Sequence, residues 1–192
     1  MLKQIIFFIL SSLILVTSCK NNNSSNEVKE SIKKDTIVSK VDTCSLLFKE
    51  VKRLDNILLN ATALDNSVAK QAIRTFYDFA SHCRQDTLAP VFLLKAGQVA
   101  QSIRKYTQAQ AFFTKCIDDF PKFKSRGAAM FLLAQLYDDA SMLNNESEAR
   151  TIYHQIIREY PNSAYANDAK ACIKNIGKTD EQLIQEFLKK NK

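Results

Sequence analysis

The sequence predicts an all-α fold, in which helical hairpins are stacked and a C-terminal helix caps the stack. The first observation is that only three glycines and three prolines occur among 192 residues, so few positions interrupt a helix. The second is that apolar side chains recur at helical spacing from residue 43 onward. The third is an internal repeat, whose two copies end in Pro121 and Pro161, 40 positions apart.

We expect eight helices, each bounded by a change in this apolar spacing. Their predicted ranges are 44–60, 64–83, 88–104, 106–119, 125–140, 145–159, 163–176 and 180–190. Pro90 suits a first helical turn, whereas Pro121 and Pro161 follow helix ends. Gly177 suits the end of the seventh helix, and Thr179 begins a Thr-x-x-Gln sequence with the spacing of a capping box.

The repeat places a small residue and an aromatic residue four positions apart in one helix of each hairpin. The two copies read Tyr106-x-x-Ala109-x-x-x-Phe113-x-x-Cys116-x-x-x-Phe120-Pro121 and Ala149-x-x-x-Tyr153-x-x-Ile156-x-x-x-Tyr160-Pro161. The small residue lets two helices approach, and the ring fills the space beside them. This pattern resembles the tetratricopeptide repeat (TPR), and the resemblance implies a TPR-like α-solenoid over residues 43–178. The alternative is a helical bundle with similar spacing.

The repeat signature fades toward both ends of this region, as expected for terminal repeats. Helices 44–60 and 64–83 are predicted to form a degenerate hairpin. After Pro161, an apolar stripe that can cover the last repeat consists of Tyr165, Ala169, Cys172 and Ile176. Residues 179–192 are predicted to form the capping helix, whose apolar face consists of Leu183, Ile184, Phe187 and Leu188.

The N-terminal segment has the organisation of a secretory signal. Lys3 precedes an apolar run from Ile5 to Val16, which is followed by small residues and Cys19. The run is shorter than the ~20 residues of a membrane-spanning helix. The segment resembles the lipobox of bacterial lipoproteins, which implies removal of residues 1–18 and attachment of a diacylglycerol and an N-acyl chain to Cys19. An ordinary signal peptide or an uncleaved anchor remain as alternatives.

Residues 19–42 are polar and carry little apolar surface, so we expect a lipidated N-terminus followed by a flexible tether. In the lipoprotein family, an Asp beside the lipidated Cys commonly retains the protein in the inner membrane, whereas this chain has Lys20 there. The first acidic residue is Glu27, so an acidic export signal directly after the Cys is missing. We therefore expect a lipid anchor in the outer membrane, on its periplasmic face, while cell-surface exposure remains open.

Composition and motifs argue against several classes of function. The net charge of +7 arises from mixed rather than clustered charges, which does not indicate nucleic-acid binding. The sequence has no glycine-rich phosphate loop, no HExxH and no nucleophile elbow. We therefore expect no enzymatic activity, no metal, no small-molecule substrate and no cofactor beyond the lipid on Cys19.

The TPR resemblance implies that the first helices of the hairpins line a groove for a protein or peptide segment. By register, the lining positions are Val91, Leu94, Gln98, Gln101 and Ser102 in the first clear repeat and Ala128, Phe131, Gln135, Asp138 and Asp139 in the second. Apolar, amide and acidic groups together suit a polypeptide ligand. The alternatives are that these residues pack against the chain's own terminal helix or are merely solvated.

Four cysteines remain after Cys19, in a compartment expected to be oxidising. Cys44 begins the first helix and Cys83 ends the second, so an antiparallel hairpin places both at its open end and allows a disulfide. Free buried thiols, or an intermolecular bond through Cys44, are the alternatives. Cys116 and Cys172 occupy positions of small core residues in the repeat, so we expect inert buried thiols.

The sequence thus predicts a non-catalytic, membrane-anchored scaffold that binds proteins, in envelope assembly. In general plan it resembles the TPR lipoproteins of the outer-membrane protein assembly machine (BamD-like). An accessory subunit of an export, secretion or cell-wall complex is the alternative, because it would share the same fold and compartment.

Overall fold

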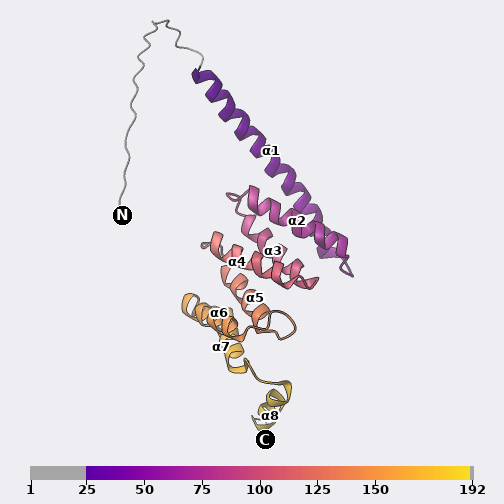
Figure 1. The fold of residues 1–192 in the computed structure, drawn as a ribbon, viewed down its shortest axis with the longest axis vertical. Coiled ribbons are helices and arrows are strands. Elements are labelled where there is room, and N and C mark those ends of the chain that lie inside the picture. The colour runs from indigo at the N-terminus through magenta and orange to yellow at the C-terminus, as the bar shows by residue number, and fades with distance from the viewer. Residues whose placement is uncertain (1–24, 191–192) are drawn as a thin grey trace, which may run out of the picture. The chain divides into compact units, whose positions relative to one another are not determined.

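The computed structural model describes residues 25–190, over which it contains eight helices and no strand (Figure 1). The helices are α1 (Ser25–Asn60), α2 (Asn66–His82), α3 (Ala89–Ser102), α4 (Tyr106–Asp119), α5 (Arg126–Asp138), α6 (Glu146–Glu159), α7 (Ala164–Asn175) and α8 (Asp180–Lys190). The predicted signal peptide (1–18) and the predicted lipidation site, Cys19, lie outside the described residues. None of the described helices combines the length and the apolar character needed to cross a membrane.

Helix α1 begins well before the position that the sequence analysis assigns to it. It starts at Ser25, whereas the sequence analysis expects a flexible tether as far as residue 42. The expectation of a flexible segment is therefore wrong for residues 25–42. The physical reason is that α1 contains no glycine or proline, and its Glu and Lys residues have good intrinsic helix propensity. Low apolar content excludes packing into a core, but it does not prevent a helix from extending once it has begun.

The chain divides into two compact units, Met1–Lys40 and Val41–Lys192, and the second contains the packed hairpins. Within it, consecutive helices from α2 to α7 pack against one another along the stack (Figure 1). The C-terminal part of α1 joins this stack, because the ring centroids of Phe48 and Phe79 lie 5.8 Å apart. The fold is thus the all-α, TPR-like solenoid that the sequence predicts.

The small and aromatic residues of the repeat form the core, where the rings fill the space between closely approaching helices. Ala109, Phe113 and Cys116 of α4 are completely buried, as are their counterparts in α6. Gly97 of α3 faces the Phe113 ring so closely that a Cβ atom at this position would overlap it. The ring therefore fills space that a glycine leaves open, and α3 and α4 can approach closely.

Most predicted helix boundaries agree with the structure to within two residues. Pro90 lies in the first turn of α3, and Gly177 has a φ of +81°, the left-handed conformation typical of a residue that follows a helix. At the start of α8, the backbone N–H of Gln182 donates to Thr179 Oγ1 at 3.3 Å. The Gln182 side chain in turn accepts from the Thr179 backbone N–H at 2.9 Å, which completes the capping box.

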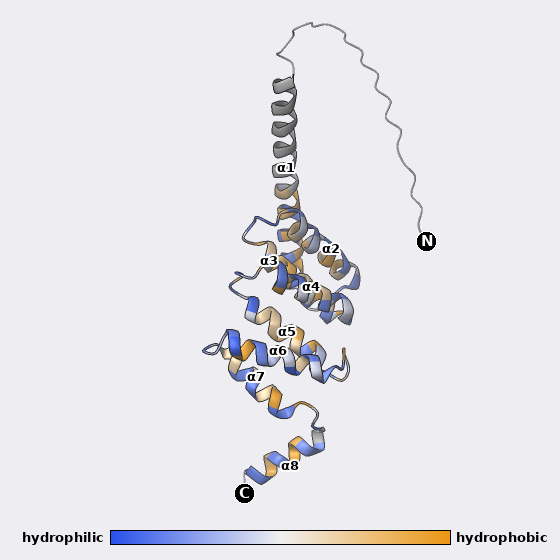
Figure 2. Ribbon diagram, turned by 60° about the vertical axis from the view of Figure 1, so that its left-hand side comes forward, coloured by the Kyte–Doolittle hydropathy of each residue, from blue (hydrophilic) through white to orange (hydrophobic). Residues whose placement is uncertain are grey.

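Of the last two helices, α7 has the role that the sequence predicts for it, whereas α8 does not. Helix α7 covers the end of the stack, with Ala166 and Ala169 completely buried. Helix α8 does not cap it, since Ile184 and Leu188 remain 56% and 49% exposed, and Figure 2 shows this apolar face along α8. The prediction of a capping helix at 179–192 is therefore wrong in this structure. The outward side of α7 offers α8 little apolar surface to cover, because it carries exposed polar residues. They are Asn167, Asp168, Lys170 and Lys174.

Candidate protein-binding surface

The residues that the sequence assigns to the groove lie on α3 and α5 or directly follow α5. Two of them, Gln98 on α3 and Gln135 on α5, are exposed, and their side chains make no hydrogen bond with another described residue. Leu94 is half-buried and packs against the hydrophobic core. Together these three side chains form a surface with one apolar group and two amides that have no hydrogen-bond partner within the described residues.

Phe131 contributes to the packing of helices in addition to lying at a groove position. Its ring centroid lies 5.8 Å from that of Tyr153 on α6 and 5.8 Å from that of Tyr165 on α7. Aromatic pairs at this distance stabilise a fold beyond the area that they bury. Phe131 therefore helps to hold α5 against α6 and α7.

Asp138 and Asp139 are also engaged within the protein. Asp138 is half-buried, and its Oδ2 accepts a hydrogen bond from the hydroxyl of the buried Tyr153 at 3.2 Å. Burial raises the pKa of Asp138, although the hydrogen bond from Tyr153 opposes this shift. Asp139 follows α5, and its Oδ1 accepts from the backbone N–H and the hydroxyl of Ser141 at 2.7 and 2.6 Å. Asp138 thus joins α5 to α6, and Asp139 orders the turn between them.

Two further groove residues, Gln101 and Ser102, make local contacts. The Gln101 side chain lies 3.8 Å from the sulfur of Met142, which belongs to the loop after α5, and Ser102 donates to the Val99 carbonyl at 2.8 Å. Fewer of the predicted groove residues are therefore free of contacts within the protein than the sequence suggests. The surface open to a partner is centred on Leu94, Gln98 and Gln135.

An ion pair that the sequence analysis missed joins α1 to α3. Lys95 Nζ lies 2.5 and 2.7 Å from the two carboxylate oxygens of Asp55 and 5.6 Å from the centroid of the Phe92 ring. The two charged side chains are only 31% and 21% exposed, so the pair is partly shielded from solvent. No local pattern could reveal it, because the partners lie 40 positions apart.

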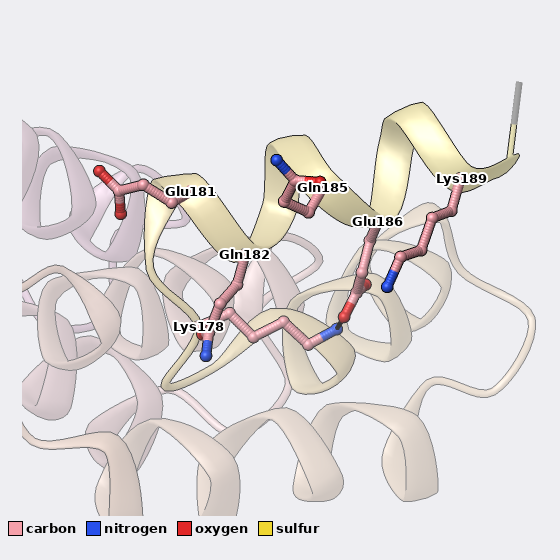
Figure 3. Close-up of a pocket in the computed structure, with 6 residues that line it drawn as sticks. All are labelled: Lys178, Glu181, Gln182, Gln185, Glu186 and Lys189. Carbon is pink, nitrogen blue, oxygen red and sulfur yellow. Dashed lines mark hydrogen bonds and ion pairs between the residues drawn. The ribbon is translucent and has the colours of Figure 1, made fainter.

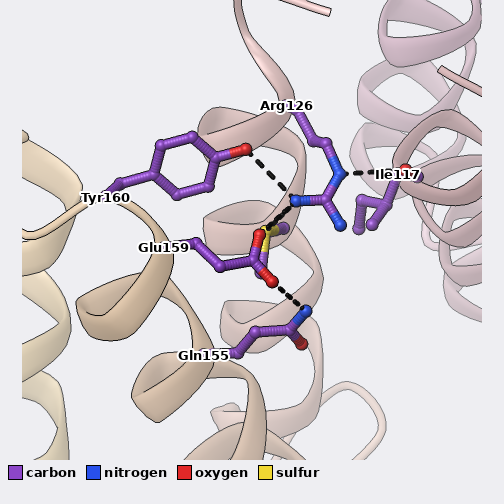
Figure 4. A network of polar contacts seen from close by, with 6 residues as sticks. Ile117, Arg126, Gln155, Glu159 and Tyr160 are labelled. Carbon is purple, nitrogen blue, oxygen red and sulfur yellow. Dashed lines mark hydrogen bonds and ion pairs between the residues drawn. The ribbon is translucent and has the colours of Figure 1, made fainter. Parts of the chain in front are cut away.

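Arg126, at the start of α5, connects three consecutive helices (Figure 4). Its Nε donates to the Ile117 carbonyl of α4 at 3.0 Å, and its Nη1 bonds to Glu159 of α6 and to the Tyr160 hydroxyl at 3.2 Å. The hydrogen bond from Gln155 and the charge of Arg126 lower the pKa of Glu159. A planar guanidinium can make these contacts together, whereas a lysine cannot. Arg126 therefore links the hairpin of α3 and α4 to that of α5 and α6.

The cysteines have distinct environments. Cys44 and Cys83 form a disulfide that joins α1 to the end of α2, with Cα atoms 5.8 Å apart. Cys116 is completely buried, and burial raises the pKa of its thiol to about 12, which makes it unreactive. Cys172 is only half-buried, so the expected deep burial holds for Cys116 and not for Cys172.

A shallow hollow of about 380 Å³ lies along the polar side of α8 (Figure 3). It is lined by Lys178, Glu181, Gln182, Gln185, Glu186 and Lys189. Lys178 and Glu186 form an ion pair at 2.7 Å across it. Acidic and basic groups therefore compensate one another here, and the hollow has no preference for a charged ligand.

Comparison with known proteins agrees with the repeat seen in the sequence. The profile of the tetratricopeptide repeat family matches residues 92–122 and 128–163, which cover α3–α4 and α5–α6. Neither the curated proteins nor the solved structures give a significant match. The two matched hairpins are similar to a module that mediates protein–protein interaction, and they support a protein-binding scaffold. Within the described part of the chain, no group of three or more His, Cys, Asp or Glu side chains could hold a metal ion.

Proposed function

We propose that this protein is a non-catalytic scaffold in envelope assembly, and that it holds a segment of a partner protein on the surface formed by α3 and α5. The observation that carries the proposal is the placement of Gln98 and Gln135. They occupy equivalent positions in the two TPR-like hairpins, and both amides are exposed and free. Repeated amides can pair with the backbone of an extended peptide, while Leu94 supplies an apolar contact.

The proposal also includes a lipid anchor at Cys19, in the periplasmic face of the outer membrane. The lipobox-like sequence that ends at Cys19 supports the anchor, and the lack of an Asp at position 20 supports the outer membrane. Labelling of cells with radioactive palmitate tests this part. We expect the label on the wild type and its loss in Cys19→Ala, together with release of that variant from the outer-membrane fraction. An unlabelled wild type would refute the anchor without affecting the binding surface.

The binding surface is tested by photo-crosslinking in cells. A photoreactive amino acid is introduced in turn at Gln98, at Gln135 and, as a control, at Thr114, which is exposed on α4. We expect the same partner to be captured from Gln98 and Gln135 but not from Thr114, and its identity would distinguish envelope assembly from secretion. Equal capture from Thr114, or no partner from either glutamine, would contradict the assignment.

A further inference from the structure

A second surface, separate from the face of Leu94, Gln98 and Gln135, lies around the turn between α3 and α4. Two neighbouring hollows of about 330 and 360 Å³ adjoin this turn, and both are lined by Lys105 and Gln108. One hollow extends to Lys70, Arg74 and Tyr77 on α2, and the other includes Arg104 and reaches the loop after α5. We define the basic surface as Lys70, Arg74, Arg104 and Lys105.

The charges of this basic surface are not compensated. No acidic residue lines either hollow. In the described part of the chain, the ion pairs involve other basic residues, so Lys70, Arg74, Arg104 and Lys105 have no carboxylate partner. This differs from the hollow along α8, where Lys178 is paired with Glu186. Unpaired cations around a hollow attract an anionic ligand.

The N-terminus of α4 adds to this positive potential. Lys105 is its N-cap residue, no side chain caps the helix, and no acidic residue lies in the first turn. The first backbone N–H groups of a helix have no partner within the helix, and the helix dipole favours an anion beside them. The turn thus offers backbone donors as well as cationic side chains.

The backbone at Arg104 is unusual for a residue with a side chain. Arg104 has a φ of +60°, a conformation in which glycine or asparagine is normally preferred. The turn itself is closed by backbone bonds, since the Lys105 N–H donates to the Ala100 carbonyl at 2.8 Å. The arginine side chain is therefore not needed to form the turn, and it has an unfavourable backbone conformation there.

We propose that this basic surface binds an acidic segment of a protein. Charge complementarity requires an anionic ligand, and Arg74 and Arg104 can bind a carboxylate with two parallel hydrogen bonds. Two adjoining hollows that share Lys105 fit an extended chain better than one small anion. Tyr77, which is 38% exposed and whose ring lies 5.4 Å from that of Phe112, provides an apolar wall for a side chain between the acids. The proposal does not depend on the surface formed by α3 and α5.

The test uses fluorescence anisotropy with the full chain and a labelled peptide in which Glu and Ala alternate. The double variant Lys70→Gln/Lys105→Gln should bind this peptide about tenfold more weakly than the wild type. The matched control is Lys122→Gln/Lys124→Gln, which removes the same charge from two exposed lysines in the turn after α4 and should bind as the wild type does. Equal weakening by the two double variants would overturn the proposal, because net charge alone would then explain binding.

Two further arms identify the ligand class and separate binding from folding. A peptide with Gln in place of Glu should not bind, and polyphosphate should compete poorly; similar affinity for either would overturn the assignment to an acidic peptide. Arg104→Gly should weaken binding while leaving the urea midpoint unchanged or higher, because glycine relieves the left-handed backbone. Full affinity of Arg104→Gly would also contradict the proposal.

Discussion

At the N-terminal end of the packed unit, a disulfide fixes α1 to the end of α2, whereas at the C-terminal end α8 follows α7 after a short connection and leaves much of its apolar face exposed. Val51 and Leu54 of α1 are completely buried, while Ile184 and Leu188 of α8 are about half exposed. A solenoid buries its apolar surface between neighbouring helices, so its ends need separate protection. The comparison shows that a covalent bond protects one end, and that the small residues and polar outer side of α7 protect the other.

Removal of the disulfide should have the largest effect on stability. The bond joins residues 39 positions apart, and closing a loop of this length lowers the entropy of the unfolded chain. Cys44→Ser/Cys83→Ser should therefore reduce the free energy of unfolding by about 3–4 kcal/mol. Urea denaturation measures this loss, and the wild type under reducing conditions serves as the control. An unchanged midpoint would mean that the N-terminal end does not depend on the bond.

Loss of the Arg126 side chain should have an intermediate effect, located between the two ends. Arg126→Met should lower the free energy of unfolding by ~1–3 kcal/mol, because the Ile117 carbonyl loses its partner and the charge of Glu159 loses its counterion. As a matched control, Arg53→Met removes an exposed arginine paired with Glu50, and should leave the midpoint unchanged. Equal effects of the two substitutions would show that the Arg126 contacts add nothing to stability.

The pH dependence of the Arg126 effect provides a further check. The folded-state pKa of Glu159 lies below its ordinary value of 4.5, so its contribution is fully present above pH 4.5 and is lost as the pH falls through the folded value. The difference between the wild type and Arg126→Met should therefore shrink in acid. A difference independent of pH would assign the effect to the Ile117 contact alone.

Deletion of residues 179–192 should have the smallest effect. Since α8 leaves Ile184 and Leu188 exposed, we expect the free energy of unfolding to change by less than about 0.5 kcal/mol. Hydrogen exchange should agree, with rapid exchange in α8 and slow exchange in α4. A loss as large as that caused by removal of the disulfide would show that α8 caps the stack in solution.

Local patterns were sufficient to predict much of the fold. The spacing of Ala109 and Phe113, repeated at Ala149 and Tyr153, identified the central hairpins, because those side chains fill the space between neighbouring helices. The start of α1 was missed because polar composition argues against a core but not against a helix. The exposure of the apolar face of α8 was not predicted. An amphipathic pattern shows that a helix has an apolar face, but not whether another surface is available to cover it.

The candidate site was predictable only in part. Repeat register correctly indicated the exposed positions Gln98 and Gln135, because register determines which side of a helix a residue occupies. It could not show that Phe131 also contacts Tyr165 or that Asp138 accepts a hydrogen bond from Tyr153. Such contacts depend on side chains from other helices, which no local pattern specifies.

The central claim is that the face of α3 and α5 holds a segment of a partner protein. Its most direct test uses the partner captured by crosslinking and measures how tightly it binds the variant Gln98→Glu/Gln135→Glu. We expect this variant to bind at least about tenfold more weakly, since each exposed amide loses its two donors and gains a charge, while its urea midpoint stays unchanged. Thr114→Glu on α4 should bind as the wild type does. Wild-type affinity in the double glutamine variant, or an equal loss in Thr114→Glu, would contradict the account.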